Sequence, residues 1–335
     1  MTETQHQYID RTTGSVKTEP LIFDRTIQFL YSTLRENAPF MFNRVISSHT
    51  STLLGFFNYD FFLKNWRVTP HEVFEHLGAD PDETIEPVEC LNTYRKIFER
   101  QIRYWETRPM NVSADTVVSP ADSRVLTGSF DQTSALFIKN KFFDFSSLLG
   151  RDKSQWQEAF ESGDFAVFRL TPDKYHYNHT PVSGVVEDLY DIDGDFHSCN
   201  PGAVVRAVTP YSLNRRSVTV INTDVPGGTH IGHVAMVEIV ALMIGGIVQC
   251  YSPSGYHPEL DIQRGLFMEK GQPKSLFRPG SSTTVLIFEK QRINFSTDLL
   301  KNQNRRDVSS RFTQGFEKPL VETDIQVRQP LATAR

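Results

Sequence analysis

The stretch Gly280-Ser281-Ser282-Thr283-Thr284-Val285-Leu286-Ile287-Phe288 runs from a glycine and several hydroxyl residues into an apolar segment. A short apolar run bounded by Gly and Pro, and rich in β-branched or aromatic residues, is typical of a buried strand. Residues 284–288 are therefore predicted to form a strand. The residues before it present hydroxyl groups at the start of that strand.

Six further segments share this pattern of short β-branched runs separated by Gly, Pro, Asn and Asp. They are residues 124–127, 165–170, 204–208, 218–222, 236–243 and 247–251. Together they predict a compact β-rich core between about residues 117 and 295. Ser154 has the spacing of a cap for a short helix between two of these strands.

The sequence pattern over residues 21–110 predicts helices. The segment 21–34 has apolar residues at helical spacing, and Thr69-Pro70-His71-Glu72 has the spacing of a capping box. Pro87 is expected to begin a helix that runs to Trp105, before Arg108-Pro109 ends it.

The chain becomes polar after about residue 302, which predicts a loose or surface-wrapping extension. We therefore expect an α+β fold in three regions. A helical N-terminal region (residues 1–110) packs on a compact β-rich catalytic core (residues 111–300), and a polar C-terminal extension follows (residues 301–335).

Composition narrows the class of protein. The 335 residues are 39% hydrophobic and 22% charged, which is typical of a globular protein, and the net charge of −5 argues against binding to nucleic acid. Three cysteines without a CxxC spacing favour a reducing compartment. We expect a cytoplasmic protein, since no signal peptide or transmembrane segment is evident.

An aromatic cluster at residues 56–66 has two interpretations. The favoured one is helix core. The other is an apolar surface that meets lipid or a partner, which would place the protein peripherally on a membrane.

Three separated segments carry reactive side chains. Ser119-Pro120-Ala121-Asp122 is a turn with a carboxylate, residues 168–181 hold His176 and His179 between prolines, and Gly280-Ser281 precedes the strand. Each alone has an ordinary structural explanation. Together they supply a hydroxyl nucleophile, a base and an orienting carboxylate. An ordinary serine hydrolase is the rival interpretation; no G-x-S-x-G motif surrounds Ser281, and composition does not decide between the two.

The three segments together resemble the phosphatidylserine decarboxylase family of pyruvoyl enzymes. The residues that carry the resemblance are Ser119-Pro120-Ala121-Asp122, Leu170-Thr171-Pro172-Asp173-Lys174-Tyr175-His176-Tyr177-Asn178-His179 and Lys270-Gly271…Gly280-Ser281-Ser282. The similarity extends over roughly residues 90–295. Four positions depart from the family pattern: Ser123 and Ser275 replace a usual glycine, Lys174 a usual aspartate, and Ser282 the commoner threonine.

The resemblance implies a self-cleaving proenzyme. The chain would be cut between Gly280 and Ser281, giving fragments 1–280 and 281–335, and Ser281 would become a covalent pyruvoyl cofactor. It also implies that Asp122 orients His179, which deprotonates Ser281. His176 is the candidate proton donor during decarboxylation.

Phosphatidylserine is the substrate that the resemblance implies, with phosphatidylethanolamine and CO2 as products. The first alternative is a related enzyme that acts on another amine-bearing carboxylate, such as a free aromatic amino acid. The second is an inert scaffold that retains the site residues. Whether the protein is a homodimer is left open.

Three other polar residues stand near the apolar run 234–241. We expect Glu238 to face solvent at a strand edge, because a buried charge needs a partner. His230 and His233 together with Glu238 form a poor zinc pattern, scattered over a loop–strand junction, so we expect no metal site.

Overall fold

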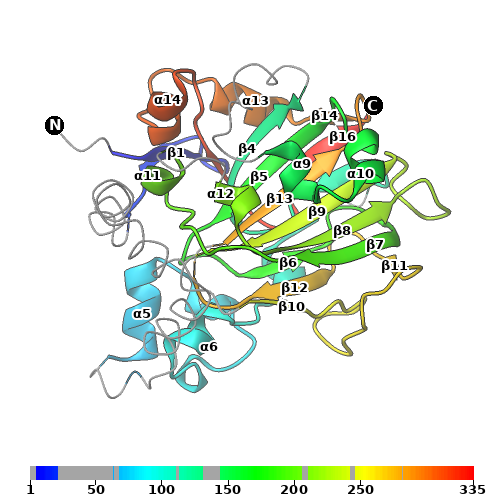
Figure 1. Cartoon of the computed structure of the whole chain (residues 1–335). Helices are drawn as coiled ribbons and strands as arrows, with labels where there is room; N and C mark the ends of the chain where they lie inside the picture. Colours follow the sequence, from blue (N-terminus) through cyan, green and yellow to red (C-terminus); the bar gives the residue numbers. More distant parts are fainter. Residues whose placement is uncertain are drawn as a thin grey trace.

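The computed structural model describes residues 5–21, 63, 68–110, 113–130, 144–205, 210–241, 246–280 and 282–335. These residues confirm an α+β fold with a β-rich core (Figure 1). The main sheet has ten strands in the order β11-β7-β8-β9-β13-β5-β4-β15-β1-β2. In that order the strands are Phe267–Met268, Gly184–Ile192, Arg216–Asn222, His233–Val240, Ser282–Phe288, Asp164–Leu170, Ser123–Ser129, Thr323–Ile325, Gln7–Asp10 and Val16–Thr18.

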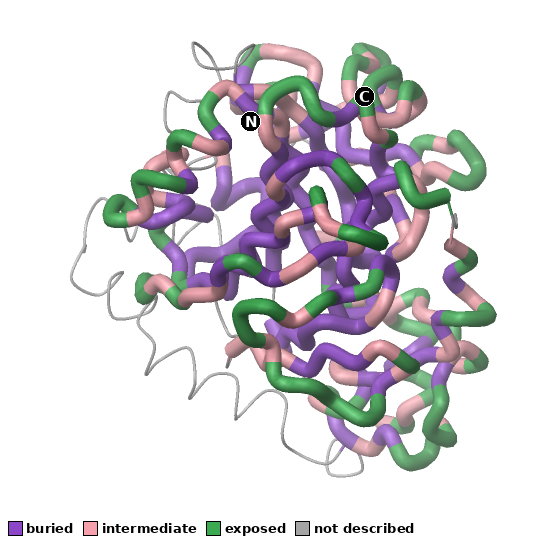
Figure 2. Tube along the Cα trace, turned by 90° about the vertical axis from the view of Figure 1, so that its right-hand side faces the viewer, coloured by how far each residue is buried: buried purple, intermediate pink, exposed green. Residues whose placement is uncertain are grey.

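Strand β13, which the opening stretch predicts, lies in the middle of this sheet. It pairs antiparallel with β9 on one side and β5 on the other over its whole length from Ser282 to Phe288. Alternate side chains enter two different cores: Val285 packs into one, and Leu286 into the other. Every residue of β13 is buried, and Figure 2 shows the buried interior that the central strands form.

Two three-stranded sheets complete the β structure. One has the order β10-β12-β6 (Ile247–Gln249, Pro273–Phe277 and Tyr177–His179), and the other has the order β14-β16-β3 (Ile293–Phe295, Pro330–Ala334 and Thr116–Val118). In Figure 1 the first small sheet lies beside the main sheet, on the side where α5 and α6 are found. This small sheet matters for function because β6 carries His179.

The predicted capping box is confirmed. Thr69 caps α5 (Pro70–Leu77) by accepting from the Glu72 backbone N–H, and the Glu72 side chain accepts from the Thr69 backbone N–H. The prediction of a continuous helix from Pro87 to Trp105 is wrong. The chain instead forms a 3-10 turn at Val88–Cys90, then α6 (Tyr94–Phe98) and α7 (Tyr104–Thr107). A new helix begins at Tyr94 because the Thr93 side chain caps it.

Short helices cover the rest of the described core. They are α9 (Phe145–Leu149), α10 (Ser154–Ala159), α11 (Pro201–Val204), α12 (Pro210–Leu213), α13 (Thr297–Gln303) and α14 (Arg311–Phe316). The helix predicted near Ser154 is confirmed as α10, although its N-cap is Lys153. None of the helices in the described part of the chain is long and apolar enough to cross a bilayer.

Most predicted strands of the core are confirmed. Residues 124–127, 165–170, 218–222 and 284–288 lie inside β4, β5, β8 and β13, while β9 and β10 end before the predicted limits. The strand predicted at 204–208 is wrong at its start, because Asn200 and Pro201 cap a helix that includes Val204. The helix predicted at 21–34 and most of the 56–66 cluster lie outside the described residues.

The expectation of a loose extension after residue 301 is wrong. Residues 323–325 form β15 inside the main sheet, where they pair with β4 and with β1 from the N-terminal region. Arg169 of β5 donates to Glu322 and to Glu19, and His6 lies 2.7 Å from Glu322. This buried ion cluster joins both ends of the chain to the core. Its charges are paired inside the protein, which is why Glu322 is buried although it is charged.

Candidate active site

The three segments singled out in the sequence meet beside β6. The His179 backbone N–H donates to the Pro120 carbonyl at 2.7 Å, which joins the Asp122 turn to the histidine segment. Pro273 of β12 pairs with His179, and the Phe277 N–H donates to the His176 carbonyl at 3.1 Å. The chain then continues from Phe277 to Gly280. The fold thus brings together segments separated by up to about 160 positions of sequence.

His179 is completely buried, and both of its ring nitrogens have partners. Nδ1 lies 2.8 Å from the Gly271 carbonyl, and Nε2 lies 2.9 Å from the Tyr175 hydroxyl. The Tyr104 ring packs edge-on against the imidazole at 4.7 Å. Burial lowers the pKa of His179 to about 3. The ring is therefore neutral near pH 7, as a general base must be.

Asp122 lies close to this histidine segment but has other hydrogen-bond partners. Its carboxylate accepts from Arg108 at 2.9 Å and from the Val327 backbone N–H at 2.8 Å. Burial opposes ionisation of Asp122, but Arg108, the Val327 N–H and Lys174 together hold the pKa of Asp122 below its usual range. Arg108 also pairs with Glu83. Asp122, which the resemblance implies orients His179, makes no hydrogen bond to it in this structure, so its influence on His179 is electrostatic.

His176 is buried in a different way. Its ring stacks on Phe98 with 3.5 Å between centroids, and neither nitrogen is in hydrogen-bonding geometry with a described residue. Burial, followed by the Arg100 guanidinium, lowers the pKa of His176 to about 3. Buried polar groups without partners are uncommon in native proteins and call for an explanation. His176 is thus a fully buried, neutral polar group.

Gly280 has a φ of 143°, a backbone conformation that L side chains rarely adopt. Ser281 itself lies outside the described residues. Ser282, which follows it, is fixed as the first residue of β13 and pairs with Leu170 of β5 and Val240 of β9. The predicted cleavage site therefore stands at the entrance to the central strand.

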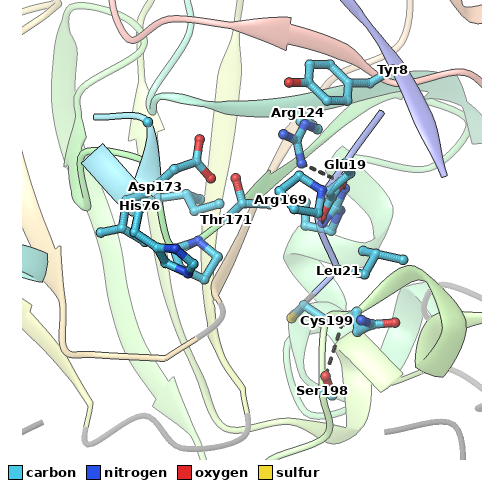
Figure 3. A pocket seen from close by; sticks show the side chains of 16 residues that line it. Tyr8, Glu19, Leu21, His76, Arg124, Arg169, Thr171, Asp173, Ser198 and Cys199 are labelled. Atoms are coloured by element: carbon cyan, nitrogen blue, oxygen red, sulfur yellow. Dashed lines mark hydrogen bonds and ion pairs between the residues drawn. The ribbon is translucent and has the colours of Figure 1, made fainter. Parts of the chain in front are cut away.

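A cavity of about 360 Å³ adjoins this entrance (Figure 3). Leu170, the partner of Ser282, lines it, as does Cys199, which accepts a hydrogen bond from Thr283 at 3.1 Å. In the view of Figure 3, Asp173 lies across the cavity from Arg124 and Glu19. The wall therefore offers side chains of both charges next to the residues that flank position 281.

Glu238 does not face solvent, so that expectation is wrong. Its strand β9 lies between β8 and β13, and the side chain is fully buried. Lys274 donates to Glu238 at 2.7 Å and Gln249 donates at 3.0 Å; Ser275 and Asn178 also bind the carboxylate. Ser275, where the family usually has glycine, thus binds a buried charge. This charge cluster joins the small sheet to the main sheet directly behind β6.

Removing Lys274 should destabilise the core strongly. In a Ser281→Ala background, chosen so that one whole chain unfolds, Lys274→Met should lower the free energy of unfolding by about 3–5 kcal/mol, because Glu238 is left buried without its cation. Lys301→Met, on the exposed surface of α13, is the matched control and should change stability by less than about 0.5 kcal/mol. Equal urea midpoints for the two variants would contradict this account.

Several site residues have no obvious signal in the sequence. Arg108 is interpreted there as the end of a helix, and the structure shows it as the partner of Asp122. Glu83, which pairs with Arg108, and Tyr256, whose hydroxyl lies 2.7 Å from that of Tyr175, come from segments that show no motif. Their roles depend on long-range packing, which a local pattern does not reveal.

Comparison with known proteins shows the family to which this chain is similar. The family model for phosphatidylserine decarboxylase matches residues 94–314. The chain is 34% identical over 227 residues to "Phosphatidylserine decarboxylase proenzyme 2" of Oryza sativa; this match covers 67% of the chain and 34% of the rice protein, so the chain spans about a third of that relative. It is 29% identical over 303 residues to the phosphatidylserine decarboxylase proenzyme of Chlamydia trachomatis (serovar L2), covering 88% of the chain and 90% of the relative. The Fusobacterium nucleatum proenzyme is 26% identical over 314 residues, covering 92% and 95%.

The described residues form an α+β fold in which the segments that carry Asp122, His176 and His179 meet beside β6. With the family model matching more than half of it, the chain belongs to the phosphatidylserine decarboxylase family, a family of carboxy-lyases made as proenzymes.

Proposed function

We propose that this chain cuts itself between Gly280 and Ser281 and then converts phosphatidylserine to phosphatidylethanolamine and CO2. One observation carries the proposal: two buried, neutral histidines, His176 and His179, contact the strand β12, which leads to Gly280. The chain in which they do so belongs to this family. The substrate, the cut and the residue roles are part of the proposal.

In the self-cleavage step, His179 takes the proton of the Ser281 hydroxyl, and the serine oxygen attacks the Gly280 carbonyl. An ester replaces the peptide bond and frees the Ser281 amine. Elimination then releases the chain end at Gly280 as a carboxylate, and water hydrolyses the remaining dehydroalanine to a pyruvoyl group with release of ammonia. Glycine suits position 280 because its φ of 143° would strain any side-chain-bearing residue. Asp122 stays ionised beside Arg108 and favours the protonated form of His179 through space.

The pyruvoyl carbonyl supplies an electron sink for the electrons left when CO2 departs. The residues of this chain fit such a group: the cut lies at the entrance to a central strand, beside a cavity, and His176 has two unpaired nitrogens. Its neutral ring carries one N–H proton that it can donate during decarboxylation.

Two features support a lipid substrate. The cavity near the start of β13 is lined by side chains of both charges, among them Glu19 paired with Arg124 and Arg169, and such a lining suits a head group bearing an ammonium, a carboxylate and a phosphate. One exposed ring also lies near the site: Trp105 is 50% exposed and packs on the buried Tyr104, whose ring contacts His179. An exposed tryptophan is suited to the interface of a membrane, so we include peripheral membrane contact in the proposal.

Two measurements on the purified protein test this proposal. Intact mass spectrometry should find fragments 1–280 and 281–335, the smaller beginning with pyruvoyl. CO2 release should then be faster from phosphatidylserine in mixed vesicles than from free serine or tyrosine. If the cut protein decarboxylates only free amino acids, the proposed lipid substrate is wrong. A single uncut chain would overturn the proposed function as a whole.

A further inference from the structure

The last strands of the chain lie directly beside the segment that carries Asp122. Strand β3, the turn 119–122 and strand β4 follow one another in the first segment, and strand β15, the turn 326–329 and strand β16 follow one another in the second. β15 pairs antiparallel with β4, and β16 pairs antiparallel with β3. The turn 326–329, which we call the C-terminal turn, therefore lies against the turn that carries Asp122.

Backbone hydrogen bonds join the two turns. The Val327 N–H donates to the Asp122 carboxylate at 2.8 Å. The Ser119 carbonyl accepts from the Arg328 N–H at 2.9 Å, and the Ser119 N–H donates to the Gln329 carbonyl at 2.8 Å. Val327 and Ser119 are fully buried and Asp122 is 5% exposed, so these bonds are shielded from water.

The C-terminal turn also reaches the surroundings of His179. The Pro120 carbonyl, in the turn that carries Asp122, accepts from the His179 backbone N–H. The Val327 side chain packs in the same apolar cluster as Tyr104, whose ring contacts the His179 imidazole. A shift of the C-terminal turn would therefore move both the carboxylate and the segment that carries the proposed base.

Arg328 shows that the conformation of the C-terminal turn is imposed by its surroundings. Its φ of 71° lies in the left-handed region, which residues other than glycine rarely adopt. Such a conformation costs free energy and persists only where neighbouring contacts enforce it. Here the Ser119 carbonyl binds the Arg328 N–H, and the guanidinium donates to the Tyr104 carbonyl at 3.0 Å and lies 5.0 Å from the centre of the Tyr104 ring.

We propose that Val327 is a positioning residue for self-cleavage, and that its backbone N–H fixes the Asp122 carboxylate relative to His179. The inference rests on the proposed roles of Asp122 and His179 in activating Ser281. Arg108 supplies the countercharge of Asp122 from a long side chain. A buried backbone N–H has no side-chain rotamers, so it restricts the carboxylate more narrowly than a side-chain donor alone.

This contact joins the two proposed products of the cut. Asp122 and His179 belong to fragment 1–280, and Val327 belongs to fragment 281–335. The fragment that would carry the pyruvoyl group therefore also supplies the donor that holds Asp122.

An ester at position 327 tests the inference, because it removes only the N–H. Cell-free synthesis with 2-hydroxyisovaleric acid in place of Val327 keeps the side chain and replaces the N–H with an oxygen. We expect the rate of self-cleavage to fall about ten-fold, which corresponds to the loss of one hydrogen bond to a charged group. Intact mass follows the appearance of fragment 281–335 and distinguishes it from hydrolysis of the new ester. Cleavage at the parent rate would overturn the inference.

Two controls separate positioning from stability. Lactic acid in place of Ala334 removes another N–H of the same terminal segment, which donates to the Asp115 carbonyl at 2.8 Å, and this ester should cleave at the parent rate. Val327→Thr keeps the N–H and the shape of the side chain but buries a hydroxyl, so it should resist urea less and still cleave near the parent rate. Urea resistance is measured by proteolysis in a Ser281→Ala background. If cleavage simply follows urea resistance across the three variants, the effect is one of stability and the inference fails.

Asp122→Asn separates this inference from the proposed function. Slow cleavage by Asp122→Asn and by the Val327 ester, with both controls at the parent rate, supports the inference. If Asp122→Asn is slow and the Val327 ester matches the parent, only the role of Val327 is lost. If Asp122→Asn cleaves at the parent rate, Asp122 has no role and the inference fails, although the cut between Gly280 and Ser281 stands. A parent chain that is not cut would overturn the proposed function and the inference together.

Discussion

Ser281→Ala is expected to give a single chain of 335 residues with no decarboxylase activity. The Ser281 hydroxyl has two proposed functions: it attacks the Gly280 carbonyl, and its carbon skeleton becomes the pyruvoyl group. Alanine supplies neither, and no external cofactor is expected to replace what is lost. The effect should therefore exceed the 100- to 10,000-fold loss typical of removing one acid–base group. Gel electrophoresis and intact mass measure the cut, and CO2 release measures turnover.

Ser282→Ala provides the control at the adjacent hydroxyl. Ser282 is the first residue of β13, it is buried, and its hydroxyl has no hydrogen-bond partner among the described residues. This variant should still cut between residues 280 and 281 and retain activity. Two fragments from Ser281→Ala, or a cut displaced to Ser282, would assign the nucleophile elsewhere.

His176→Ala and His179→Ala should fail at different stages. His179→Ala is expected to remain a single chain, because the base for Ser281 is lost. His176→Ala should still cut, at least partly, yet release CO2 on the order of 100- to 10,000-fold more slowly, as expected when a general acid is removed. The structure separates the two histidines physically: His179 is held by Gly271 and Tyr175, whereas His176 stacks on Phe98 with its nitrogens unpaired.

A structural role for His176 predicts a different result. If His176 only packs against Phe98, its loss should lower the melting temperature, self-cleavage and turnover together. Phe98→Leu is the control for packing, because it removes the stacked ring and leaves the imidazole. A stable, fully cut His176→Ala protein with parental turnover would remove His176 from the mechanism.

The central strands were predictable because their sequences carry a local signal. Residues 284–288 are apolar, short and bounded by turn residues, and the capping box at Thr69 is a local pattern as well. Glu238 and residues 301–335 were not predictable in the same way. Glu238 is buried because Lys274, 36 positions away, supplies its charge partner, and Glu322 is buried because Arg169 does so from 153 positions away. A pattern read along the chain does not contain such pairings.

The same difference between local and long-range signals applies to the candidate site. The segments with Asp122, His176 and His179 could be found from their residue types and from the family resemblance, and the fold brings these segments together. The hydrogen bonds around them could not be found in this way. Arg108 reaches Asp122, and Gly271 reaches His179, through contacts between separate segments that depend on tertiary packing, whereas Tyr175 contacts His179 from four positions earlier in the same segment.

The central position of β13 has a consequence for how the cut protein unfolds. Its two neighbours, β9 and β5, both belong to fragment 1–280, so fragment 281–335 would begin as a strand clamped on both sides. For fragment 281–335 to dissociate, the hydrogen bonds of β13 with both β9 and β5 must break at once, so spontaneous dissociation should be slow. Refolding, however, would need two molecules to meet, so its yield should depend on protein concentration. The persistence of the cut enzyme would then be set by a rate of unfolding instead of an equilibrium between folded and unfolded chains.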